Sequence, residues 1–155
     1  MAVRAYLSLG SNLGKREALL REAIARIGQL PGTRIVAESP LLETAPWGNT
    51  DQPAFLNLAL AIETTLTPEA LLDGLRAIED ALGRQRTEHW GPRTVDIDIL
   101  VYDGVTRDTS TLRLPHPYLT ERLFVLQPLA EIAPDLVVHG QTVRAWLDLL
   151  LRKGG

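Results

Sequence analysis

The chain contains the stretch HWGPRTVDIDIL at residues 89–100. Apolar residues alternate there with Asp96 and Asp98, and alternate residues of a strand share one face. The pattern predicts a strand over residues 95–102 that buries its apolar side chains and turns both aspartates to one site. Two carboxylates so close repel each other, so we expect a cation or a metal to compensate them, and Mg²⁺ prefers oxygen ligands. The plainer interpretation of such a triplet is a solvated strand face.

The fold class follows from the order of the elements around this strand. Strands and helices alternate, but two extended segments follow each other in the middle, which is typical of an α+β fold with a ferredoxin-like split βαβ sandwich. We expect an antiparallel sheet with helices packed on it, in a single domain over residues 1–155. The predicted strands are 5–10, 33–43 with a break at Pro40, 56–66, 95–102 and a short partner strand at 111–114; the predicted helices are 16–30, 68–82, 123–132 and 143–151.

Composition excludes several classes of protein. The chain has no cysteine, so any metal must bind oxygen or imidazole. A net charge of −3 argues against general nucleic-acid binding, which needs a basic face. No apolar run approaches the roughly 20 residues of a membrane span, and no signal peptide precedes the first predicted strand. We therefore expect a cytoplasmic protein with neither a nucleic-acid nor a membrane partner.

A second chemical signal precedes the aspartate strand. Arg84, Arg86 and Arg93 lie in or beside one polar loop, together with Trp90 between a histidine and a glycine. Guanidinium groups hold phosphates in bidentate fashion, and an aromatic residue on a stiff Gly-Pro turn suits stacking on a flat ring. The alternative is a solvated basic loop, which explains the charge but not the tryptophan.

Four further residues have ordinary explanations when taken alone. Glu79 suits a solvent-facing position on its helix, and His116 between prolines suits a structural role. Phe55 and Asn57 are compatible with loop positions, although an amide beside an aromatic ring also suits a heterocycle. The GSNLG turn at residues 10–14 lacks the lysine and hydroxyl residue of a P-loop, so we interpret it as a strand-to-helix connection.

Together these motifs resemble the 6-hydroxymethyl-7,8-dihydropterin pyrophosphokinase family of folate biosynthesis. The resemblance covers essentially the whole chain. It rests on LSLGSNLG near the start, ETAPWGNTDQPAFLN in the middle, HWGPRTVDIDIL, and LPHPYLTERLFVLQPLAEIAPDL toward the end. It implies Mg²⁺-dependent transfer of pyrophosphate from ATP to the pterin hydroxymethyl group, with release of AMP.

The resemblance also implies roles for individual residues. Asp96 and Asp98 match the aspartates that hold two Mg²⁺ ions, and Arg84 and Arg93 match arginines that clamp phosphates in the transition state. The implied pterin contacts are Thr44, Ala45, Trp47, Phe55, Asn57, Trp90 and Phe124; the implied ATP contacts are Arg76, Glu79, Arg86, His116 and Arg122. The chain departs from the frequent family residues at Ala45, Trp47, Phe55, Arg76 and Pro117, which affects the shape of both pockets rather than the reaction.

Two other functions are compatible with parts of the sequence. A non-catalytic ferredoxin-like ligand-binding module explains the fold and the acidic charge, but it has no use for paired aspartates beside arginines. A metal-dependent phosphohydrolase explains the aspartates and predicts phosphate release without a pterin. The resemblance favours the kinase, with ATP and the pterin as its partners and a monomeric chain.

Overall fold

The structure is a computed structural model that describes residues 1–11, 16–44, 55–83 and 95–153. Its main sheet contains the strands β1 (Val3–Ser11), β2 (Thr33–Glu38), β3 (Leu42–Thr44), β4 (Phe55–Thr64) and β5 (Asp96–Tyr102). The strand order is β2-β4-β1-β5, with β3 also paired to β4, and every pairing is antiparallel. The helices α1 (Arg16–Gly28) and α2 (Pro68–Gly83) follow β1 and β4. This arrangement confirms the predicted split βαβ plan.

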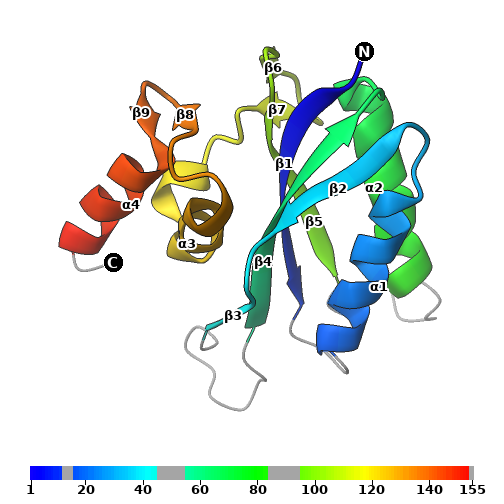
Figure 1. Cartoon of the computed structure of the whole chain (residues 1–155), viewed down its shortest axis with the longest axis horizontal. Helices are drawn as coiled ribbons and strands as arrows, with labels where there is room; N and C mark the ends of the chain where they lie inside the picture. Colours follow the sequence, from blue (N-terminus) through cyan, green and yellow to red (C-terminus); the bar gives the residue numbers. More distant parts are fainter. Residues whose placement is uncertain (12–15, 45–54, 84–94, 154–155) are drawn as a thin grey trace.

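One face of the sheet is covered by α1 and α2 (Figure 1). Both helices form where the sequence repeats apolar residues at helical spacing. The side chain of Thr67 caps the start of α2 by accepting a hydrogen bond from the Ala70 N–H at 3.1 Å. Leu71 and Leu75 of that helix are fully buried. They belong to the same core as Leu7 of β1 and Ile97 of β5, which are also fully buried. The larger apolar core therefore lies between this helix pair and the sheet.

The opposite face carries α3 (Leu123–Ile132), with α4 (Val143–Arg152) lying outside it (Figure 1). A smaller core forms here around Leu126 and Leu129 of α3. A register shift between β1 and β5 also turns both Leu100 and Val101 toward this core, because a bulge interrupts the strict alternation of a strand. Among the described residues, α3 covers only part of this face, and a cavity lies on the remainder.

Three small elements refine the predictions for the second half of the chain. The predicted partner strand near residue 111 is β7 (Arg113–Leu114), which pairs with β6 (Arg107–Asp108) in a separate two-stranded sheet rather than with the main sheet. A 3₁₀ turn, Leu119–Glu121, precedes α3. A hairpin of β8 (Val137–Val138) and β9 (Gln141–Thr142) was not predicted.

The turn of this hairpin has a clear sequence cause. Both of its central residues have positive φ, 50° at His139 and 86° at Gly140, as a two-residue hairpin turn of the primed type requires.

None of the helices in the described ranges is long and apolar enough to span a bilayer.

Candidate active site

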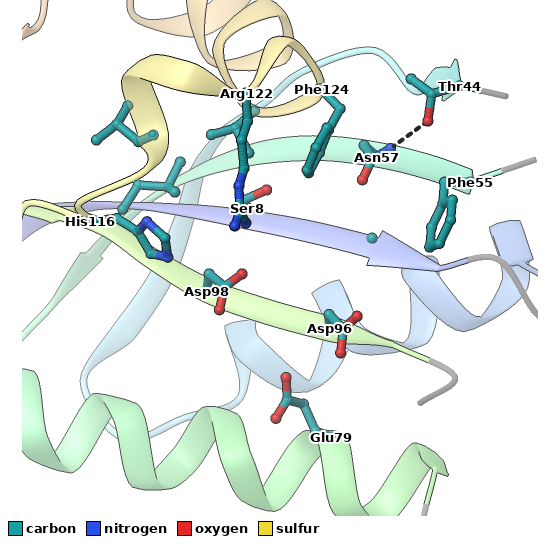
Figure 2. A pocket seen from close by; sticks show the side chains of 14 residues that line it. Ser8, Thr44, Phe55, Asn57, Glu79, Asp96, Asp98, His116, Arg122 and Phe124 are labelled. Atoms are coloured by element: carbon teal, nitrogen blue, oxygen red, sulfur yellow. Dashed lines mark hydrogen bonds between the residues drawn. The ribbon is translucent and has the colours of Figure 1, made fainter. Parts of the chain in front are cut away.

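A cavity of about 620 Å³ opens on the face of the sheet that α3 only partly covers. Figure 2 shows its floor, formed by the three adjacent strands β4, β1 and β5, and its far wall, formed at the start of α3. Its principal polar and aromatic lining residues are Ser8, Thr44, Phe55, Asn57, Glu79, Asp96, Asp98, His116, Arg122 and Phe124. The cavity thus brings together segments that are far apart in the sequence, from Ser8 to Val125.

Asp96 and Asp98 project from the same side of β5 into this cavity (Figure 2). Ile97 between them is completely buried on the other side of the sheet, which confirms the alternation predicted from the sequence. Their cross-strand partners on β1 are small, Gly10 opposite Asp96 and Ser8 opposite Asp98. Small partners leave the space above the carboxylates open, a feature that the sequence analysis did not recognise.

One end of the cavity carries a buried amide between aromatic walls. Asn57 is 5% exposed and lies on β4, within the strand predicted over residues 56–66 rather than at the loop position that it suits when taken alone. Its side-chain amide donates to the Thr44 hydroxyl at 3.3 Å. Phe55 on the same strand and Phe124 from α3 also line this end (Figure 2). An oriented amide between flat apolar rings is suited to recognising the edge of a heterocycle.

Gly10 explains how this amide reaches its position. A Cβ atom at residue 10 would lie only 2.7 Å from Oδ1 of Asn57. Gly10 is therefore required inside β1 by a close approach across the sheet, in addition to the strand-to-helix turn that the sequence suggested.

The opposite end of the cavity is cationic. The Arg122 guanidinium lies 5.2 Å from the ring centre of Tyr118 and 5.9 Å from that of Phe124, distances at which a cation is attracted to an aromatic face. His116 accepts a hydrogen bond at Nδ1 from the Tyr118 N–H, at 3.2 Å. Burial lowers the pKa of His116, the Asp98 carboxylate opposes this shift and Arg122 adds to it. A neutral His116 then carries its proton on Nε2 and serves as a hydrogen-bond donor.

A second cavity of about 380 Å³ adjoins the first. The two share Asp98, His116 and Arg122, so the aspartate lies where the cavities meet. The second cavity is also lined by Arg76 of α2 and by residues 110–113 near β7. Two adjoining cavities with a carboxylate and two nitrogen groups at their boundary suit two substrates that react with each other.

Glu79 differs from the predicted solvent-facing acid. It is 6% exposed, and its carboxylate accepts from the Ile97 N–H at 2.7 Å and from Arg76 at 2.8 Å. The same Arg76 nitrogen also donates to the Ile97 carbonyl at 2.9 Å. The sequence did contain a signal for this inward position, because Glu79 is four residues after Leu75 on the buried stripe of α2.

The remaining predicted site residues are Ala45, Trp47, Arg84, Arg86, Trp90 and Arg93, which lie outside the described residues. Within the described ranges, no group of three or more histidine, cysteine, aspartate or glutamate side chains is gathered as for a metal. The aspartate pair is thus an oxygen donor set that needs further ligands from a substrate or water. Magnesium commonly has such a coordination, with one or two carboxylates, phosphates and retained waters.

Solved structures share this fold. The wild-type HPPK-DHPS of Plasmodium falciparum with pteroate aligns with a TM-score of 0.79 at 16% identity, and the alignment covers 99% of this chain and 43% of that one. A triple mutant of the same protein with STZ-DHP aligns with a TM-score of 0.77, covering 44% of its chain. The present chain spans less than half of those proteins, and at this identity the likeness concerns the fold alone.

Sequence comparison is more specific. A 2-amino-4-hydroxy-6-hydroxymethyldihydropteridine pyrophosphokinase of Methylorubrum extorquens is 55% identical over 95% of this chain and 93% of its own length. The enzyme of the same name from Bacillus subtilis is 48% identical over 85% of this chain and 79% of its own. The sequence model of 7,8-dihydro-6-hydroxymethylpterin-pyrophosphokinase (HPPK) matches residues 6–134. With its fold, its paired aspartates and these relatives, the chain belongs to the HPPK family.

Proposed function

We propose that this chain transfers pyrophosphate from ATP to 6-hydroxymethyl-7,8-dihydropterin in folate biosynthesis, giving the pterin diphosphate and AMP. The observation that carries the proposal is the position of Asp98 at the boundary of two adjoining cavities, with Asp96 beside it on the same face of β5. One cavity offers an amide and aromatic walls, and the other offers nitrogen donors. These are the contacts that a flat heterocycle and a nucleotide polyphosphate need.

The end of the larger cavity that carries Asn57 takes the pterin. The amide of Asn57 recognises the ring edge and is oriented by its hydrogen bond to Thr44. Phe55 and Phe124 enclose the ring faces. The family resemblance implies that Ala45, Trp47 and Trp90 complete this pocket.

The boundary of the cavities takes the phosphates. Arg122 and the neutral His116 donate to phosphate oxygens there, and Arg76 lies on the nucleotide side. On the resemblance, Arg84, Arg86 and Arg93 add charge around the phosphates during transfer. Glu79 lines the larger cavity, and the resemblance implies that it also contacts ATP.

The residues present fit Mg²⁺, because the two co-facing carboxylates supply oxygen ligands and leave positions for phosphates and water. We propose two ions held by Asp96 and Asp98. When bound, Mg²⁺ neutralises phosphate charge and lowers the pKa of a coordinated hydroxyl.

The reaction is an in-line displacement. The pterin hydroxyl oxygen forms a bond to the β-phosphorus, the bond from that phosphorus to the bridging α-oxygen breaks, and AMP leaves on the opposite side. The hydroxyl proton passes to an Asp98 oxygen or to water. This chain contributes mainly by positioning its two substrates and by compensating charge. We further propose a monomer that acts in the cytoplasm without nucleic-acid or membrane partners.

The test measures AMP formation from ATP and the pterin with added magnesium. Asp98→Ala is expected to lower the rate at least about a hundredfold, because it removes a charged group at the reacting phosphates, while far-UV circular dichroism stays unchanged. Asp148→Ala, an exposed acid on α4, is the matched control and should keep wild-type activity. An inactive wild type would favour the ligand-binding module, and phosphate release without pterin would favour the phosphohydrolase.

A further inference from the structure

We propose that Arg76 and Glu79 are positioning residues that complete the free edge of β5 and thereby fix the spacing and direction of Asp96 and Asp98. The four groups involved are the two side chains and the backbone N–H and carbonyl of Ile97, here called the edge clamp. This inference rests on the proposed function, because it concerns how the same site is held in its active geometry.

The edge clamp exists because β5 ends the main sheet. In the described part of the chain, β5 pairs with β1 on one side and with no strand on the other. The backbone groups on the outer side of an edge strand need partners if they are shielded from water. Ile97 is fully buried at its side chain, and its outward N–H and carbonyl both bind side chains of α2.

The hydrogen bonds form a closed ring. Glu79 Oε2 accepts from the Ile97 N–H at 2.7 Å, Arg76 Nη1 donates to the Ile97 carbonyl at 2.9 Å, and the same nitrogen donates to Glu79 Oε1 at 2.8 Å. Arg76 and Glu79 together thus offer one acceptor and one donor to Ile97, as a residue of a neighbouring strand would. Each buried polar group in the ring has a partner. The Glu79 side chain is only 5% exposed, and burying a carboxylate to this extent is costly unless it is hydrogen-bonded.

The position of this ring matters because Ile97 is the residue between the two aspartates. Holding the backbone of the central residue fixes the direction of both its neighbours. A slip of one residue in the pairing of a strand would turn its entire set of side chains to the opposite face, and even a displacement of about 1 Å at a reacting centre is expected to reduce the rate of catalysis about a hundredfold. The clamp therefore supports the rate of transfer more than the binding of either substrate.

Two substitutions at Glu79 separate this role from direct contact with the nucleotide. Glu79→Ala removes the acceptor of the Ile97 N–H, so kcat is expected to fall about 10- to 100-fold while the Kd of a non-hydrolysable ATP analogue changes less than about threefold. Glu79→Gln keeps an oxygen that can accept from the Ile97 N–H, but its amide nitrogen cannot accept from Arg76, so it should retain more of kcat than Glu79→Ala. A residue acting through its negative charge would lose as much activity in the glutamine variant as in the alanine variant.

A measurement without substrates tests the edge clamp itself. In amide hydrogen exchange followed by nuclear magnetic resonance, the Ile97 amide should lose protection in Glu79→Ala and keep it in Glu79→Gln. Asp73→Ala is the matched control, since Asp73 is an exposed acid on the same helix, and it should change neither exchange nor kcat. The double variant Arg76→Ala with Glu79→Ala should be about as slow as Glu79→Ala alone, because the two side chains act as one unit.

The outcomes are separable. Unchanged kcat in Glu79→Ala, or a loss confined to ATP affinity, would overturn the inference and assign Glu79 to nucleotide binding. If the alanine variant does not fold, Glu79→Gln decides, and a loss of both Ile97 protection and kcat there would overturn the expectation that the acceptor is what matters. A wild type that forms no AMP would instead refute the proposed function, whereas the exchange experiment would still report on the clamp.

Discussion

The substitution Gly10→Ala tests the pterin end of the site with a single methyl group. The new Cβ would lie 2.7 Å from Oδ1 of Asn57, which is about 0.7 Å short of the 3.4 Å at which ordinary contact begins. The backbone of β1 is fixed by pairing on both sides, so the Asn57 amide has to move. We expect that movement to disturb its 3.3 Å hydrogen bond to Thr44.

The size of the effect follows from this displacement. Adding a methyl group to a close-packed position costs about 1–3 kcal/mol, which corresponds to a fall in melting temperature of roughly 2–12 °C for a chain of this length. If Asn57 recognises the ring edge, losing its orientation removes hydrogen bonds worth about 1.5–3 kcal/mol, or roughly 10- to 150-fold in pterin affinity. Affinity for an ATP analogue should fall less than pterin affinity, because neither Gly10 nor Asn57 lines the second cavity.

The assay is isothermal titration of the pterin, with thermal unfolding measured in parallel. Gly28→Ala is the control, since its Cβ would meet Ile35 at an ordinary 3.6 Å. Unchanged pterin affinity in Gly10→Ala, together with a lowered melting temperature, would refute the role given to Asn57. An unchanged melting temperature would refute the close approach itself.

Two further predictions concern the other face and the histidine. Trp146→Phe removes the hydrogen bond from the indole N–H to the Val138 carbonyl at 2.6 Å. The free energy of unfolding measured in urea should fall by about 0.5–1.5 kcal/mol, while AMP formation stays unchanged. A loss of activity would contradict the separation of this region from the site. Burial lowers the pKa of His116, although the Asp98 carboxylate opposes this shift. The folded chain therefore binds fewer protons than the unfolded chain as the pH falls below about 6.5, and the free energy of unfolding decreases there. In His116→Gln the decrease between about pH 7 and pH 5 should be smaller than in the wild type, and an equal decrease would contradict the assigned shift.

The sequence predicts those features that depend on local periodicity. Asp96 and Asp98 share a face because apolar residues alternate with them, and the structure confirms this. The start of α2 was predicted from Thr67-Pro68-Glu69, and the Thr67 cap is present. In both cases the deciding interactions lie within a few residues along the chain.

Features that depend on distant partners were not predictable in the same way. The charge of Glu79 suggests solvent, and only the free edge of β5 explains why the side chain turns inward. The closeness of Gly10 and Asn57 likewise depends on the pairing register of two strands separated by more than forty residues. Such contacts are set when the sheet assembles, so a residue-by-residue pattern does not contain them.

The two faces of β1 have a consequence for inhibitor design. Leu7 and Leu9 support the larger core, whereas Ser8 and Gly10 face the cavity. A compound that contacts only side chains of the cavity face meets positions such as Ser8, where many substitutions leave the larger core intact and resistance can arise at little cost to folding. A compound that also contacts Gly10 and Asn57 would engage two positions whose close approach across the sheet restricts substitution. Its inhibition should therefore persist through more generations of selection.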